Sequence, residues 1–313
     1  MGQGNIQRIM CLYPKLIKNK KYMPTKKNKG VVPPCPDERL RYVTAACGKC
    51  YECRKQKGRA WQVRLSEEVR NDPNAIFVTL TISDESWEKL RKKYSYSSEE
   101  DYIKKMVRLF LERIRKETKK SIKHWLTTER GEKNTERYHL HGLIWGDKNG
   151  ILTTRHWQYG FVYIGEFVNE KTCNYVTKYI TKRDEKHKDF EPITLCSAGI
   201  GAGYLSRSDS ELNRFREGKT TETYRLRNGT KLNLPIYYRN KLYTDKEREK
   251  LFLQKIKKGK VWICGRECNI KDWKTYSQIL KEEQIKAKQL HGDSPIDWDI
   301  AKYKRRLARQ RPK

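Results

Sequence analysis

The chain has 313 residues, of which 36% are hydrophobic and 11% aromatic, enough to bury a core and to exclude a wholly disordered polycation. Its 70 lysines and arginines outnumber 38 acidic residues and leave a formal charge of +32, which favours nucleic acid as the partner. No run of about 18 apolar residues is present and residues 1–21 lack the apolar centre of a signal peptide, so we expect no membrane span and no secretion. Nine cysteines, an odd number, favour free thiols or metal ligands over a disulfide framework.

Both ends of the chain are basic. No acidic residue precedes Asp37, and residues 1–34 also contain prolines and glycines, so they are expected to form a flexible basic arm. Residues 302–313 include Arg305 and Arg306 in a basic tail that phosphates would neutralise with release of counterions. A tail that only improves solubility is the alternative.

Hydrophobic periodicity is readable from Ala75 onward. It predicts, in chain order, a strand over 75–82, a helix over 98–119, paired strands over 122–130 and 137–145, a strand over 161–168 and a helix over 169–182. This order favours an α+β fold, with one antiparallel sheet, helices on one face and the other face free for a site. The pattern weakens beyond residue 189, where two further helices are expected over 245–258 and 276–290.

These features predict four segments: a basic flexible arm over 1–34, a cysteine-rich segment over 35–70, a catalytic core over 71–190 and a basic, partly helical extension over 191–313. In the second segment, Cys47, Cys50 and Cys53 have the two-residue gaps that let thiolates share a zinc ion, with Cys35 as the fourth ligand. Reduced thiols packed in a turn are an equal alternative. A zinc ion there would hold near DNA the basic residues that follow, namely Arg54, Lys55, Lys57 and Arg59.

Two histidines lie two residues apart in the predicted strand 137–145. Alternate side chains of a strand share a face, so His139 and His141 are placed to bind one metal ion. Glu129 on the paired strand offers a carboxylate as third ligand, and Glu132 in the turn is the alternative. Such a ligand set leaves positions open on Mg²⁺ or Mn²⁺ for phosphate oxygens. Structural histidines beside a surface glutamate are the other interpretation.

Two tyrosines lie four residues apart in the predicted helix 169–182. Tyr175 and Tyr179 therefore share a helix face, and Lys178 and Lys182 each follow a tyrosine by three residues. The alternative is tyrosines that pack their rings while the lysines extend into solvent. Together with a metal that polarises a phosphodiester, a phenolate here could attack phosphorus in line. The ordinary pKa of a phenol is near 10, so activation by the metal or a lysine is required.

These residues resemble the three motifs of HUH endonucleases, which initiate rolling-circle replication. The resemblance rests on the strand 77–82, on His139-Leu140-His141 and on Tyr175-x-x-Lys178-Tyr179-x-x-Lys182. With the segments 47–54, 197–201 and 234–238, the order closely resembles the replication initiators of single-stranded DNA microviruses, specifically the gokushovirus branch, over roughly residues 35–245. Leu140 replaces the bulky apolar or aromatic residue that the family often has between the histidines.

The resemblance implies a ferredoxin-like or RRM-like core and a complete reaction. One strand of the double-stranded replicative form would be nicked at the origin, with tyrosine joined to the 5′ phosphate and the 3′ hydroxyl free to prime synthesis. The second tyrosine would then attack the regenerated origin, and the displaced single strand would be closed into a circle without ATP. Mg²⁺ or Mn²⁺, a host helicase and a host DNA polymerase are implied, in the host cytoplasm.

Two alternatives from other classes stay open. One is a noncatalytic protein that binds or packages single-stranded DNA by charge and stacking. The other is a plasmid relaxase or a transposase with the same chemistry. The sequence also leaves open which tyrosine attacks first, and whether Lys178 or Lys182 steers phosphate, orients a water or protonates the leaving oxygen.

Overall fold

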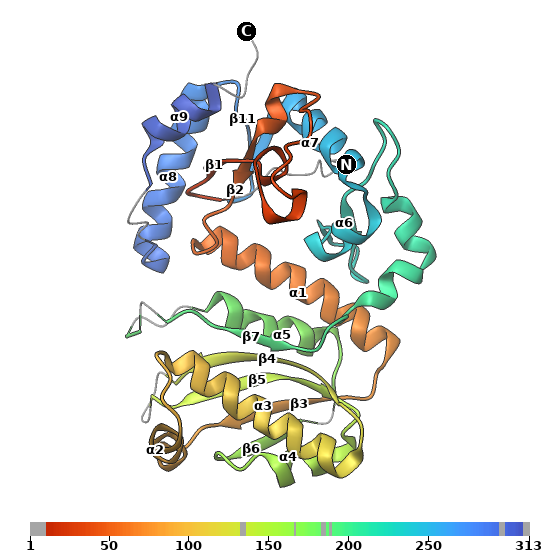
Figure 1. Cartoon of the computed structure of the whole chain (residues 1–313), viewed down its shortest axis with the longest axis vertical. Helices are drawn as coiled ribbons and strands as arrows, with labels where there is room; N and C mark the ends of the chain where they lie inside the picture. The colour runs from red at the N-terminus through yellow and green to blue at the C-terminus, as the bar shows by residue number, and fades with distance from the viewer. Residues whose placement is uncertain are drawn as a thin grey trace. The chain divides into compact units, whose positions relative to one another are not determined.

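The computed structural model describes residues 11–131, 136–165, 167–182, 186–187, 190–293 and 298–308. The chain divides into two compact units (Figure 1). Residues 58–207 form one unit, and the segments 1–57 and 208–313 together form the other. This division differs from the four predicted segments, because the described residues near both ends, 11–57 and 298–308, fall in the same unit.

The unit 58–207 is built on a five-stranded sheet of strand order β6-β3-β5-β4-β7. Each neighbouring pair is antiparallel. The strands are β3 (Ala75–Thr81), β4 (Lys123–Arg130), β5 (Tyr138–Trp145), β6 (Val162–Gly165) and β7 (Thr194–Cys196). The helices of this unit are α2 (Asp84–Lys93), α3 (Glu99–Thr118), α4 (Ile151–His156) and α5 (Glu170–Thr181), with the part of α1 (Tyr51–Asn71) from Gly58 onward. The α+β class and the antiparallel sheet are thus confirmed.

One face of the sheet is covered by α3, which runs across the strands in Figure 1. Alternate residues of β3, namely Ile76, Val78 and Leu80, are buried on this face together with Phe110 and Ile114 of α3. The amphipathic pattern of α3 places its apolar residues toward the sheet, and Ser98 caps the helix through the backbone of Asp101. This side forms the main hydrophobic core of the unit.

The opposite face is partly covered as well, whereas the sequence predicts it to be free. Leu65 and Val69 of α1 and Val176 of α5 pack there with Trp125 and Leu143 of the sheet. Burial of Trp125 explains the difference, because a large apolar ring on this face requires a cover. The remaining part of the face carries polar residues.

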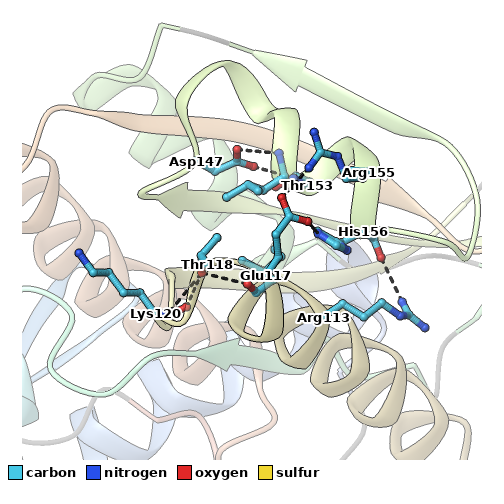
Figure 2. Close-up of polar contacts among 10 residues, drawn as sticks. Arg113, Glu117, Thr118, Lys120, Asp147, Thr153, Arg155 and His156 are labelled. Carbon is cyan, nitrogen blue, oxygen red and sulfur yellow. Dashed lines mark hydrogen bonds and ion pairs between the residues drawn. The ribbon is translucent and has the colours of Figure 1, made fainter.

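Polar contacts join the end of α3 to α4, as Figure 2 shows. Asp147 accepts hydrogen bonds from the amides of Leu152 and Thr153 and so caps the first turn of α4. Glu117 at the end of α3 forms an ion pair with Arg155 of α4 and hydrogen-bonds with His156 Nε2 at 2.6 Å. The next residue, Trp157, donates a hydrogen bond from its indole to the carbonyl of Thr81, the last residue of β3.

The other unit consists of short strand pairs and helices. Its strands are β1 (Lys15–Lys18), β2 (Tyr42–Ala45), β8 (Thr223–Arg225), β9 (Lys231–Asn233), β10 (Lys260–Ile263) and β11 (Arg266–Asn269), which pair as β1-β2, β8-β9 and β10-β11. Its helices are the start of α1, α6 (Ile236–Leu242), α7 (Asp245–Lys258), α8 (Trp273–His291) and α9 (Ile300–Ala308). The predicted helices over 245–258 and 276–290 are confirmed as α7 and α8.

The first described residues belong to this unit and do not form the flexible arm predicted over 1–34. Leu12 and Leu16 are fully buried, and β1 pairs with β2. Gln284 and Trp298 donate hydrogen bonds to backbone carbonyls of the same stretch. The prediction of a flexible arm relied on the charge pattern, which does not reveal that a few apolar residues, such as Leu12 and Leu16, are buried while the neighbouring Lys15 is exposed. Within the described part of the chain, no helix has the length and apolar character needed to cross a membrane.

Candidate active site

The strand register gathers polar residues into rows on the partly open face of the five-stranded sheet. In one row, His141 of β5 lies opposite Thr79 of β3 on one side and opposite Thr127 of β4 on the other. In the next row, His139 lies between Thr81 and Glu129 in the same way. Residues directly opposite one another in a sheet point to the same face, so both histidines and Glu129 share this face as predicted.

Each histidine is oriented by the threonine opposite it on β3. Thr79 Oγ1 lies 3.0 Å from His141 Nδ1, and Thr81 Oγ1 lies 3.1 Å from His139 Nδ1. A hydrogen bond at Nδ1 leaves Nε2 as the atom that faces outward from the strand. Burial and the neighbouring His141 lower the pKa of His139, which favours the neutral imidazole that a metal ligand requires.

Glu129 connects His141 to the end of α5. Its two carboxylate oxygens lie 2.8 Å from His141 Nε2 and 2.6 Å from Lys182 Nζ. Burial opposes ionisation of this carboxyl, but the hydrogen bonds from His141 and Lys182 outweigh burial and lower its pKa. Glu129 is therefore held as a carboxylate beside a histidine and an ammonium group.

The tyrosines of α5 lie against the same residues. The ring of Tyr179 stacks on that of His141, with centroids 4.0 Å apart and planes at 6°. The hydroxyl oxygens of Tyr175 and Tyr179 are 2.6 Å apart, and Tyr175 also meets the ring of Phe77 edge-on. Burial first, and then the hydrogen bond with Tyr175, raise the pKa of Tyr179 well above its ordinary value. Tyr175 is 49% exposed.

Local interactions hold α5 in this position. Asn169 forms a capping box with Thr172 at the start of the helix. Cys173, Val176 and Ile180 are buried on the face opposite to the exposed Tyr175 and Lys178. A side chain at Gly58 of α1 would come within 3.3 Å of the Thr181 methyl, so the absence of a Cβ there lets α1 lie close to α5.

His139, His141 and Glu129 share a face, but their ligand atoms do not all lie within 4.8 Å of one another in this structure. Two imidazoles and a carboxylate on one face are ligands that Mn²⁺ and Mg²⁺ accept in partial coordination. His141 and Glu129 are in direct contact, while the ring centroids of His139 and His141 are 6.1 Å apart. Glu132, the alternative third ligand, lies outside the described residues.

Exposed aromatic residues next to these rows were not predicted as site residues. Tyr163 of the edge strand β6 lies opposite Thr79 and is 53% exposed, with its ring 6.3 Å from that of Phe77. Phe161, two residues earlier, is 70% exposed. The two-residue spacing of Phe161 and Tyr163 is the signal that could have drawn attention to them. The sequence alone does not show that β6 is an edge strand, where side chains can stay exposed to solvent.

The basic residues predicted to bind DNA are in different environments. Arg54 forms an ion pair with Asp293, and Arg306 donates a hydrogen bond to the carbonyl of Leu16, so both also serve the fold. Lys57 and Arg305 are exposed.

Lys55 lies over the ring of Tyr51, with Nζ 5.3 Å from the ring centroid, and 3.8 Å from a carboxylate oxygen of Glu52. Arg59 is half-buried. DNA binding by these residues stays a prediction.

The cysteine group in the structure differs from the predicted one in a single member. Cys47, Cys50 and Cys53 lie together, but their fourth neighbour is Cys11, while the thiol of Cys35 donates to the carbonyl of Asp37. Within the described ranges, Cys11 and these three form the one group of three or more His, Cys, Asp or Glu whose ligand atoms all lie within 4.8 Å. Spacing could not find Cys11, because it precedes the next member by 36 residues.

Comparisons with known proteins match the segment of the chain that carries these residues. Residues 75–184 match the family model described as replication-associated protein ORF2/G2P, a range that begins with β3 and ends just beyond α5. The chain is 25% identical to replication-associated protein ORF2 of Spiroplasma virus 4 over 269 residues, which cover 77% of this chain and 81% of that protein. It is also 25% identical to replication-associated protein VP4 of Bdellovibrio phage phiMH2K over 218 residues, covering 62% and 66% respectively. No solved structure matches the chain. The segment from β3 to just beyond α5 is therefore similar to the replication-associated protein ORF2/G2P family, and with the two relatives this similarity confirms the predicted resemblance to phage replication initiators.

Proposed function

We propose that the chain initiates rolling-circle replication of a small single-stranded DNA phage by nicking the origin strand through a tyrosine, and later rejoins unit-length circles. The observation that carries the proposal is the stacking of Tyr179 on His141, with Tyr175 hydrogen-bonded to Tyr179. Two phenols thereby lie beside the imidazole and carboxylate groups that suit a divalent cation. The names of the two relatives, both replication-associated proteins, support the same role.

The reaction transfers a phosphodiester from DNA to the protein. A phenol oxygen loses its proton and attacks the scissile phosphorus in line, the bond from phosphorus to the 3′ oxygen breaks, and that oxygen takes up a proton. The 5′ phosphate is then joined to tyrosine and the 3′ hydroxyl is free. His139, His141 and Glu129 would hold a Mg²⁺ or Mn²⁺ ion, which supplies neutralisation of the phosphate charge.

We assign the first attack to Tyr175. Its exposure lets a phosphodiester approach its hydroxyl, whereas Tyr179 is covered by the His141 ring on one side. The hydrogen bond between the two hydroxyls gives Tyr179 a way to stabilise the charge that develops on Tyr175. Lys182, held by Glu129, positions that carboxylate, while the exposed Lys178 is placed to meet phosphate.

Single-stranded DNA has a suitable binding surface beside the tyrosines. Exposed aromatic rings stack on unpaired bases of any sequence, and the exposed Tyr163 lies opposite Thr79 on the face that carries His139 and His141, with the exposed Phe161 two residues before it. Positive charge in the chain as a whole supplies affinity for the backbone. Strand separation and synthesis would be provided by a host helicase and a host DNA polymerase.

The covalent intermediate can be tested with single-stranded oligonucleotides that tile both strands of the circular genome encoding the chain. Each is labelled at the 3′ or the 5′ end, incubated with the full-length protein and Mn²⁺, and separated under denaturing conditions. We expect the 3′ label to migrate with the protein and the 5′ label to leave as a shorter free fragment. Binding of every oligonucleotide without any adduct would instead favour a noncatalytic single-strand binding protein.

Tyrosine variants assign the nucleophiles. Tyr175→Phe should abolish the first adduct, Tyr179→Phe should keep it but block transfer to a second origin, and the double variant should form none. Tyr96→Phe is the matched control, because Tyr96 is exposed but lies in the connection between α2 and α3 and packs on Tyr94 and Tyr102. An adduct in the double variant would show that another residue attacks.

A further inference from the structure

Four thiols from two separate stretches of the chain meet in the unit formed by 1–57 and 208–313. Cys11 precedes β1, Cys47 and Cys50 lie between β2 and α1, and Cys53 lies in the first turn of α1. Cys11, Cys50 and Cys53 are buried and Cys47 is half-buried. All are reduced in this structure, and the unit holds them without a disulfide among the described residues.

The distances between the sulfur atoms match those around a single tetrahedral ion. A tetrahedral zinc ion with bonds of about 2.3 Å to sulfur places its thiolates roughly 3.8 Å apart. The Sγ separations are 3.8 Å for Cys47 and Cys53, 3.4 Å for Cys50 and Cys53, and 4.0 Å for Cys50 and Cys11. An iron–sulfur cluster is a poorer fit, because the cluster atoms between its cysteine ligands would keep the sulfurs further apart.

Backbone amides point at the sulfurs in the way that stabilises metal-bound thiolates. The amide of Cys47 donates to Cys11 Sγ at 3.2 Å, and the amide of Tyr13 donates to the same sulfur at 3.3 Å. The amide of Cys50 donates to Cys47 Sγ at 3.3 Å. Such outer hydrogen bonds orient ligands and offset the negative charge of a four-thiolate site.

We propose that Cys11, Cys47, Cys50 and Cys53 bind one Zn²⁺ ion, and that Cys35 is not a ligand. Four protein ligands fill a tetrahedral ion and leave no open position, so the site is structural and takes no part in phosphodiester chemistry. It is independent of the proposed nicking reaction, whose candidate ligands are His139, His141 and Glu129.

The ion would join the first described residues to the start of α1. At the start of this helix, Asp293 accepts a hydrogen bond from the amide of Tyr51 and forms an ion pair with Arg54. Because the strand pairs of this unit have only three or four residues each, their backbone pairing contributes little alone, and a metal link compensates. The ion would thus add a direct link to the hydrophobic cluster in which Leu12, Cys50 and Leu280 already pack together.

Metal content of the full-length protein is the first test. Protein purified without added chelator should contain one zinc per chain by elemental analysis, and substitution with Co²⁺ should give the absorption bands of tetrahedral cobalt bound to thiolates. Absence of zinc both in the purified protein and after addition of Zn²⁺ would overturn the proposal. Iron in place of zinc would overturn the choice of metal, and paired disulfides, detected by mass, would overturn metal binding.

A matched pair of variants then identifies the fourth ligand. Cys11→Ser should lose most of the bound zinc and the cobalt bands, whereas Cys35→Ser should keep both, because Cys35 lies outside the group. Zinc lost from Cys35→Ser and kept by Cys11→Ser would refute the assignment.

The wild-type chain gives the same answer if Cys11→Ser does not fold. With zinc bound, an alkylating reagent followed by peptide mass analysis should find Cys11, Cys47, Cys50 and Cys53 protected, while Cys35 reacts. Addition of a zinc chelator should make the four reactive. Equal reactivity of the four with and without zinc would refute the proposal, whatever the outcome of the nicking assay.

Discussion

Replacing Thr79 by valine tests whether the threonines of β3 position the histidines for metal binding. Valine keeps the shape and the strand preference but removes the hydroxyl that lies 3.0 Å from His141 Nδ1. For Nε2 to face a cation, Nδ1 must carry the proton and donate it to this hydroxyl. Loss of such a partner typically weakens metal affinity or activity by about 10- to 100-fold.

The structure predicts that the two threonine substitutions weaken metal binding to different extents. His141 is 7% exposed, so water cannot replace the lost hydroxyl, and we expect Thr79→Val to lie near a loss of roughly 100-fold, or about 2.7 kcal/mol. His139 is half-buried, so water can serve in place of Thr81, and Thr81→Val should lose only about 10-fold.

The assay measures adduct formation with a cleavable single-stranded oligonucleotide over a range of Mn²⁺ concentrations. Both variants should need more Mn²⁺ for half-maximal rate and approach the wild-type rate at saturation, and Thr79→Ser should restore the wild-type dependence. Thr127→Val is the control, since the Thr127 hydroxyl is buried beside His141 but has no hydrogen-bond partner among the described residues. An unchanged Mn²⁺ dependence in Thr79→Val would refute a positioning role for the hydroxyl.

Three further predictions concern binding and stability. In a Tyr175→Phe, Tyr179→Phe background, which prevents cleavage, the further changes Phe161→Ala and Tyr163→Ala should weaken binding of a single-stranded oligonucleotide by about 1–3 kcal/mol for each stacked base. Fluorescence anisotropy measures this affinity, and Leu290→Ala, a change at another exposed apolar residue, should leave it unchanged. Glu68→Ala should lower the free energy of unfolding by about 1–3 kcal/mol in urea, because it removes a buried carboxylate that accepts a hydrogen bond from the Gly201 amide and pairs with Lys123. A loss no larger than that of the exposed Glu85→Ala would contradict this. Asp147→Ala should cost about 0.5–2 kcal/mol in the same measurement through loss of the α4 cap, and the exposed Lys148→Ala should be neutral; equal effects would argue against capping.

The shared faces of the candidate site residues could be predicted because short-range periodicity determines them. The two-residue spacing of His139 and His141 in β5 and the four-residue spacing of Tyr175 and Tyr179 in α5 are local properties of a strand and a helix. Their meeting depends on tertiary packing, which resemblance to a family suggested and spacing alone could not. The ion pair between Glu129 and Lys182 likewise depends on tertiary packing and could not be predicted from spacing.

The helix α1 shows why other parts could not be predicted. Its interior side carries Glu67 and Glu68, which are buried and neutralised by Arg207 and Lys123 from distant segments. Buried carboxylates interrupt the apolar repeat that marks an amphipathic helix, so the periodicity of this segment is weak. The same reasoning applies to Cys11, whose neighbours come from segments far along the chain.

The short contact between the hydroxyls of Tyr175 and Tyr179 bears on the order of strand transfer. Ionising one of them leaves an oxyanion that its neighbour can stabilise by donating its hydrogen, but ionising both would place two negative charges 2.6 Å apart. The pair can thus offer one charged oxygen at a time. In the proposed reaction, this mutual exclusion would keep the idle tyrosine protonated while its neighbour attacks, so the two transfers would take turns at one pair of hydroxyls.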